Sequence, residues 1–345
     1  MPVARWMRRL AVAGVLLCFT VVVLGAYVRL SAAGLGCPDW PGCYGHLTPP
    51  AERSADAPAA WAGRPLAPAK AWREMTHRYA AGALALVILV ITALAISARR
   101  ARVASVPFAL ALFATVIVQA ILGMLTVTWR LTPLVVTLHL LFGLTTLGLL
   151  WWLVLSLPKS SWGATALQSA GRAIRGGGAS PIVSGRQLAV LALAALALQL
   201  ALGGWTSSNY AAIACLDFPT CQGQWWPHTD YRSAFALWHP PNVNYEGGVL
   251  DSPARTAIHV THRLGALITA AALALAALHV LRHRGGLAGA RLRAWAVLGA
   301  LGLQLLIGVA MVLKAFPLSL ATAHTAGAAL LLLATLALLR SLSTR

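Results

Sequence analysis

Residues 132–157 read TPLVVTLHLLFGLTTLGLLWWLVLSL, a stretch that contains no charged side chain. A helix of about 20 apolar residues crosses a hydrocarbon layer of about 30 Å. This stretch therefore predicts a membrane-spanning helix. Its one titratable side chain is His139, which lies in the first half of the stretch.

Similar apolar stretches recur along all 345 residues, of which 59% are hydrophobic and 10% charged, with a mean hydropathy of +0.74. This composition is far from that of a water-soluble domain. The sequence predicts an all-α integral membrane protein with eight transmembrane helices, and the first is kept as an anchor because no small-residue signal cleavage site closes it. The predicted spans are residues 10–30, 76–97, 105–128, 132–157, 186–206, 256–281, 292–313 and 318–340.

The charges predict the orientation of the chain. With the N-terminus inside, the inner segments hold sixteen of the 27 Lys and Arg residues, while all eight acidic residues and the other eleven cations fall outside. Inner loops of membrane proteins carry such an excess of cations. The net charge of +19 thus reflects topology and excludes nucleic acid as the partner. We expect a bacterial-type cytoplasmic membrane protein with both termini in the cytoplasm.

The chain contains an internal repeat. Gly25 and Cys37 match Gly203 and Cys215 at an offset of 178, and later residues match at 185, as in the pair His139 and His324. The repeat predicts two tandem four-helix bundles, residues 1–157 and 186–345, related by a pseudo-two-fold axis along the membrane normal. The basic, glycine-rich residues 158–185 form the predicted cytoplasmic linker.

One pair of cysteines lies in each outer loop, Cys37 with Cys43 and Cys215 with Cys221. In an oxidising outer compartment such pairs favour two disulfides. Free or metal-binding thiols are the alternative, although the spacing is not that of a zinc site.

Each half also carries two histidines 62 residues apart, His77 with His139 and His262 with His324. Two neutral imidazoles facing each other inside a four-helix bundle suit the axial positions of a haem iron. Zinc or copper is less favoured, since each half offers two nitrogens. The alternative is that the histidines bond between helices, as Gln119, Gln199 and Gln304 would in their Gln-x3-Gly settings.

Neighbouring residues extend the haem interpretation. Arg78 and Arg263 follow a histidine at the membrane surface, where a guanidinium can pair with a haem propionate. Small residues beside the histidines would leave room for a flat ring. These residues are Gly82, Gly143, Gly265 and Gly327.

The halves differ three residues before the first histidine of each pair. The first half has Glu74 at this position, and the second half has His259. Residues i and i+3 share a helix face, so Glu74 should lie beside whatever His77 binds. An ionisable group at the edge of an apolar bundle is a functional candidate. The alternative is an acid that favours a helix start.

Together these features resemble the haem A synthase family over almost the whole chain. The resemblance rests on the eight spans, the Glu-x2-His-Arg motif from Glu74 to Arg78, the four histidines, the paired cysteines and the loop text of residues 34–41 and 217–223. It implies oxidation of a methyl substituent of haem O, through a hydroxymethyl intermediate, to the formyl group of haem A.

The resemblance also implies roles for individual residues. His77 and His139 would flank the substrate haem, Glu74 would take part in the chemistry, and His262 and His324 would hold a haem b. Cys37 and Cys43 are associated with activity in the family, and the pair Cys215 and Cys221 is expected to be structural. Implied partners are haem O, membrane lipid, haem O synthase and an unidentified electron acceptor.

Two other classes of function stay open at this stage. A dihaem b-type electron-transfer cytochrome would use all four histidines and leave both haems unaltered. A membrane thiol oxidoreductase would use the outer cysteines and leave the histidines unexplained. A transporter is less favoured, because the spans show no array of intramembrane charges.

Overall fold

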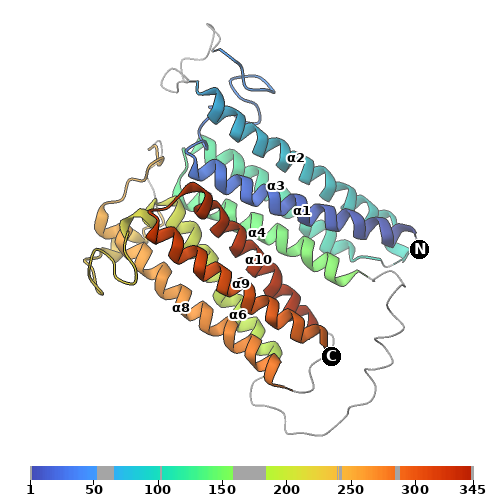
Figure 1. Ribbon diagram of the computed structural model, residues 1–345. Helices are drawn as coiled ribbons and strands as arrows, with labels where there is room; N and C mark the ends of the chain where they lie inside the picture. Colours follow the sequence, from blue (N-terminus) through green and yellow to red (C-terminus); the bar gives the residue numbers. More distant parts are fainter. Residues whose placement is uncertain are drawn as a thin grey trace.

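The fold was taken from a computed structural model, which describes residues 2–52, 66–101, 103–157, 184–238, 240, 243–283 and 288–342. Among these residues all the regular elements are helices (Figure 1). The long helices are α1 (Pro2–Leu30), α2 (Pro68–Ser97), α3 (Val106–Thr128), α4 (Pro133–Ser156), α6 (Gly185–Ser208), α8 (Ser252–Arg282), α9 (Ala288–Leu313) and α10 (Leu318–Leu342). The short ones are η2 (Arg99–Ala101), η4 (Ala211–Ala214) and α7 (Tyr231–Ala234).

Eight helices in the described part of the chain are long and apolar enough to cross a membrane, which confirms the predicted all-helical membrane fold. Two predicted spans begin eight residues late: α1 begins at Pro2 rather than at residue 10, and α2 begins at Pro68 rather than at residue 76. Proline is favoured in the first helical turn. Lys70, Arg73 and Glu74 lower the hydropathy of the first part of α2, so a search for apolar residues begins the span too late.

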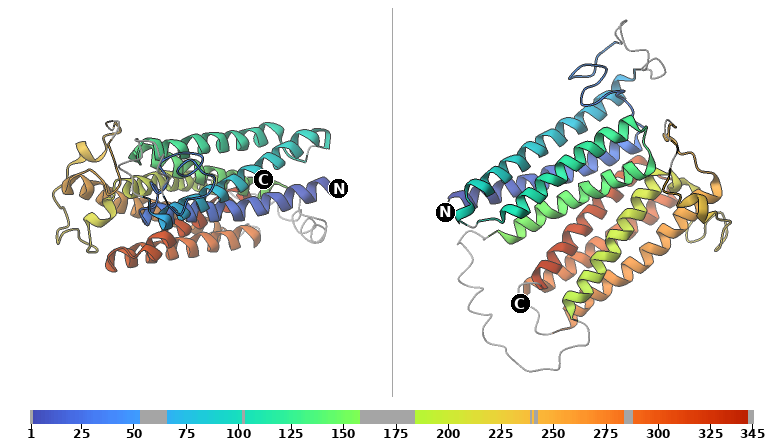
Figure 2. Two further views of the ribbon diagram at one scale, coloured as in Figure 1. Left: turned by 90° about the horizontal axis from the view of Figure 1, so that it is seen from above. Right: turned by 180° about the vertical axis from the view of Figure 1, so that it is seen from behind.

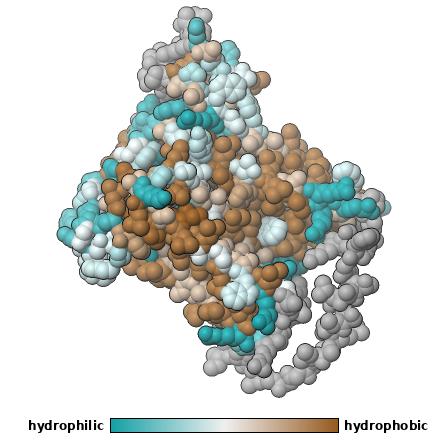
Figure 3. Space-filling model, viewed as in Figure 1, coloured by the Kyte–Doolittle hydropathy of each residue, from teal (hydrophilic) through white to brown (hydrophobic). Residues whose placement is uncertain are grey.

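The eight long helices lie side by side, and the start of α1 and the end of α10 lie at the same end of the assembly (Figures 1 and 2). The loops that follow α1 and α6 lie at the opposite end. Hydrophobic residues cover the middle of the visible face, and hydrophilic residues gather toward the ends (Figure 3). This distribution is the one that a surrounding bilayer requires.

The first four long helices and the last four make equivalent contacts. Helix α1 packs on α2 and α4, and α3 on α2 and α4; in the same way α6 packs on α8 and α10, and α9 on α8 and α10. Contacts of α1 with α10, α4 with α6 and α4 with α10 join the two sets. The division at residues 158–185 stays a prediction, because residues 158–183 lie outside the described part.

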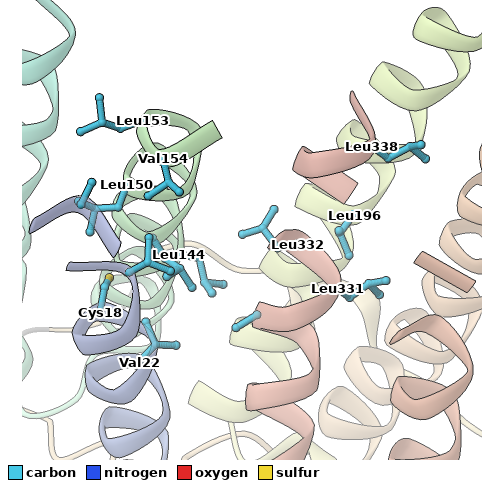
Figure 4. Packing of buried hydrophobic residues seen from close by; sticks show 14 of the residues in the cluster. Cys18, Val22, Leu144, Leu150, Leu153, Val154, Leu196, Leu331, Leu332 and Leu338 are labelled. Atoms are coloured by element: carbon cyan, nitrogen blue, oxygen red, sulfur yellow. The ribbon is translucent and has the colours of Figure 1, made fainter. Parts of the chain in front are cut away.

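The core between the sets is continuous. Cys18 and Val22 of α1 and Leu144 of α4 lie on one side, with Leu196 of α6 and Leu332 of α10 on the other (Figure 4). Polar contacts also cross the same interface. The Trp151 indole donates to the carbonyl of Leu333 at 2.9 Å, and the hydroxyls of Thr137 and Ser208 are 3.1 Å apart.

The approach of α6 to α4 depends on Gly204. A Cβ atom built there would lie 3.1 Å from Cγ2 of Thr137 and 3.3 Å from Cδ2 of Leu140. Small residues allow such close packing between membrane helices.

We predict that Gly204→Leu separates α6 from α4 and destabilises the fold by about 1–3 kcal/mol, the usual cost of overpacking. Thermal unfolding of the detergent-solubilised protein would measure it. Gly302→Leu is the matched control, because Gly302 is exposed and a Cβ there meets nothing within 4 Å. Equal unfolding temperatures for the two variants would contradict the prediction.

Candidate functional site

The structure brings the paired histidines of the first half together. His77 of α2 and His139 of α4 have ring centroids 6.5 Å apart, with the ring planes at 74°. The equivalent histidines of the second half are His262 of α8 and His324 of α10.

Each of the four rings lies against a glycine of the neighbouring helix. A Cβ atom built on Gly25 would be 2.9 Å from Cε1 of His77. The corresponding distances are 3.2 Å from Gly123 to His139, 3.2 Å from Gly203 to His262 and 3.1 Å from Gly308 to His324. Any larger residue would displace the ring. The sequence analysis had marked Gly25 and Gly203 as equivalent positions of the repeat, and the structure shows what these glycines contact.

The four glycines that were expected to make room for a flat ring have a different setting. Gly143, Gly265 and Gly327 lie against the side-chain amides of Gln119, Gln199 and Gln304, respectively. A Cβ at Gly82 would meet nothing within 4 Å. Three of these glycines therefore make room for a glutamine.

The paired rings fit a haem. Two imidazoles that bind one metal ion from opposite sides, each through a bond of about 2 Å, place their centroids about 6 Å apart. The separation of His77 and His139 is close to this value, and the Nδ1 atom of each is buried without a hydrogen-bond partner. The described residues hold no group of three His, Cys, Asp or Glu side chains able to bind an ion. An ion here would need a bound group that supplies further ligands, and a porphyrin does so.

Glu74 is buried in the first half, one turn before His77. Its Oε2 accepts a hydrogen bond from the backbone N–H of Cys37 at 2.9 Å, and its Oε1 lies 2.5 Å from Nη2 of Arg78. The first turn of α2 contains no acidic residue. Glu74 is therefore not an acid that favours a helix start, and its position is fixed by the outer loop.

The two arginines hold the outer loops. Nη1 of Arg78 donates to the carbonyls of Asp39, Pro41 and Gly42, while Arg263 donates to those of Thr220 and Asp217 at 2.7 and 2.8 Å. These donors are thus engaged by backbone carbonyls. The pairing of either guanidinium with a propionate stays a prediction, and it would have to compete with these contacts.

Both outer cysteine pairs form disulfides, as the sequence analysis expected. Cys37 and Cys43 are joined by an S–S bond of 2.03 Å, and Cys215 and Cys221 by one of 1.97 Å. Among the described cysteines Cys18 is free and buried.

An aspartate two residues after the first cysteine organises each loop. Asp39 accepts from the N–H groups of Tyr44 and Gly45 at 2.6 and 2.8 Å, and Asp217 accepts from those of Gln222 and Gly223 at 2.7 and 3.0 Å. Hydrogen bonds from the Thr220 hydroxyl and these N–H groups lower the pKa of Asp217 to about 2. The shared Cys-x-Asp spacing was a signal of this role that the sequence analysis did not use.

His259 takes the place of Glu74 in the second half. Its buried ring contacts Phe316, with 6.1 Å between ring centroids, and its Nδ1 has no hydrogen-bond partner. Arg78 therefore has a carboxylate partner, Glu74, whereas Arg263 binds its loop with a histidine at the equivalent position.

Comparisons with known proteins agree with these features. Residues 8–336 match the family model COX15-CtaA, described as cytochrome oxidase assembly protein. The chain is also 40% identical over 336 residues to the protein named "Heme A synthase" of Shewanella oneidensis, which covers 95% of this chain and 93% of the relative. The chain therefore belongs to the COX15-CtaA family of cytochrome oxidase assembly proteins.

Proposed function

We propose that this protein is a haem A synthase, an oxidoreductase that converts a methyl substituent of haem O to the formyl group of haem A through a hydroxymethyl intermediate. The relative at 40% identity supports the assignment. The observation that carries it is the pair His77 and His139, set at a spacing that suits a haem iron, with the buried carboxylate of Glu74 one turn away.

In this proposal the two halves have different tasks. His77 and His139 bind the iron of the substrate haem O, and residues 1–157 form the catalytic half. His262 and His324 hold a resident haem b in residues 186–345. Haem b supplies electron transfer when it is bound.

Glu74 is the residue that we assign to proton transfer at the substrate. A carboxylate in an apolar setting can hold a water molecule or accept a proton from the reacting group. Arg78 and the Cys37 N–H hold both of its oxygens. The loop closed by Cys37 and Cys43 therefore positions Glu74, which gives this disulfide a part in activity.

The proposal also assigns a location and partners. The protein would span a bacterial inner membrane with both termini in the cytoplasm and the disulfide loops outside. Haem O would come from haem O synthase, and electrons would leave to an acceptor.

Glu74→Gln should leave haem bound and lower haem A formation by about 10²-fold or more, since a positioned acid or base contributes about 10²–10⁴-fold. Pigments extracted from membranes of cells that make haem O would be separated and quantified. Glu52→Gln, at an exposed loop residue, is the control. Unchanged haem A in the Glu74 variant would instead favour an electron-transfer cytochrome.

The histidine variants should separate the two haems. His262→Ala and His324→Ala should lose the haem b absorbance of the purified protein, and His77→Ala and His139→Ala should lose bound haem O or haem A while keeping haem b. His46→Ala, at an exposed loop histidine, should keep both. If haem b were lost from the His77→Ala and His139→Ala variants and kept in the His262→Ala and His324→Ala variants, the assignment of the two halves would be reversed.

The orientation can be tested in spheroplasts. Single free cysteines placed at the exposed residues Thr48 and Arg100 in a Cys18→Ala background should differ, with an impermeant maleimide labelling Thr48→Cys alone. Labelling of Arg100→Cys before lysis would contradict the cytoplasmic placement of this end of the helices. Membranes opened by lysis provide the control that both thiols can react.

A further inference from the structure

Three of the four haem-site histidines accept a hydrogen bond at their backbone carbonyl from a glutamine of the neighbouring helix. We call this residue the fastening glutamine. The side-chain amide nitrogen of Gln199 donates to the backbone carbonyl of His262 at 2.9 Å and lies 3.1 Å from its Nδ1. Gln304 donates in the same way to His324 at 3.1 Å, and Gln119 to His139 at 2.9 Å. Each amide nitrogen also lies within 3.5 Å of a ring nitrogen.

His77 is the exception among the site histidines that the structure describes. Each fastening glutamine lies four residues before the glycine that contacts the ring, and the residue four before Gly25 is Val21. Val21 is buried and apolar. The side chain of Val21 has no amide to donate to the backbone of α2.

A second substitution accompanies the first. Gly265 leaves room for the Gln199 amide, because a Cβ there would overlap the amide oxygen. The equivalent residue at the repeat offset of 185 is Ala80. Ala80 thus stands where the second half has the glycine beside its amide, so His77 lacks both the donor and that glycine.

Groups around a metal ligand fix its orientation, and losing one typically costs about 10–100-fold in metal affinity or activity. Helices α6 and α8 also pack more extensively than α1 and α2, as α9 and α10 do compared with α3 and α4. Both ligands of the second half are therefore held in place. In the first half, His139 has such a glutamine and His77 does not.

We propose that the missing amide makes His77 the releasable ligand, so that the first half exchanges its haem while Gln199 and Gln304 retain the haem of the second half. This inference rests on the proposed function, in which the first half must release product. It assigns to Val21, Ala80 and the three glutamines a positioning role that controls the lifetime of each bound haem.

The test measures haem release from the full-length protein purified with both haems. Excess apomyoglobin would capture released haem, and the Soret absorbance would follow its transfer. We expect a fast phase that carries haem O or haem A and a slow phase that carries haem b, each identified by its pyridine haemochrome spectrum. A fast phase made of haem b would overturn the proposal.

Exchanging the residues at these equivalent positions between the two halves should exchange the rates at which the two sites release haem. Val21→Gln with Ala80→Gly should slow the fast phase by about 10-fold, and Gln199→Val with Gly265→Ala should speed the slow phase by about 10–100-fold. Gln187→Val is the control, since Gln187 is an exposed residue at the start of α6. Both phases should then be unchanged.

A purely structural role of the glutamines has a different signature. It would lower the unfolding temperature of the Gln199→Val and Gly265→Ala variant and leave its haem release rates unchanged, and this result would overturn the proposal. Gln304→Val provides a second variant if the first does not fold. Release needs no turnover, so a failure of the Glu74 test would refute the proposed reaction and leave this measurement interpretable.

Discussion

The contact between each site histidine and a glycine of the next helix is the constraint on which the arrangement depends. Hydrocarbon offers no water to a polar ring, so the imidazole has to be accommodated within the protein. Gly25, Gly123, Gly203 and Gly308 let the neighbouring backbone approach the ring to ordinary contact distance. This requirement makes α1 and α2, α3 and α4, α6 and α8, and α9 and α10 neighbours, and those pairs bring the histidines of each half together.

Much of the fold could be predicted from the sequence because a bilayer imposes its own length scale on apolar segments. The eight spans followed from that scale, and the disulfide pairs from the position of the cysteines in loops that face an oxidising compartment. The partners of Arg78 could not be predicted in this way. A guanidinium can donate to a propionate, to another carboxylate or to several carbonyls. The sequence does not reveal that Asp39, Pro41 and Gly42 turn their carbonyls toward it.

The fastening glutamines illustrate the same limit. The sequence displays the Gln-x3-Gly spacing three times, but the spacing alone does not tell which histidine each amide reaches. The position of Val21 is informative only once Gly25 is seen against His77. The absence of a glutamine at Val21 is informative because the structure shows the glutamine contact at the three equivalent sites.

The same comparison explains why Glu74 requires a functional account. In the second half Arg263 holds its disulfide loop through backbone carbonyls and the ring of Phe218, with His259 in place of the carboxylate. The loop architecture therefore does not need an acid at this position. Burying a carboxylate costs free energy that its partners only offset. Since the fold forms without this cost in one half, its presence in the other is best explained by a requirement of the chemistry at the His77 and His139 site.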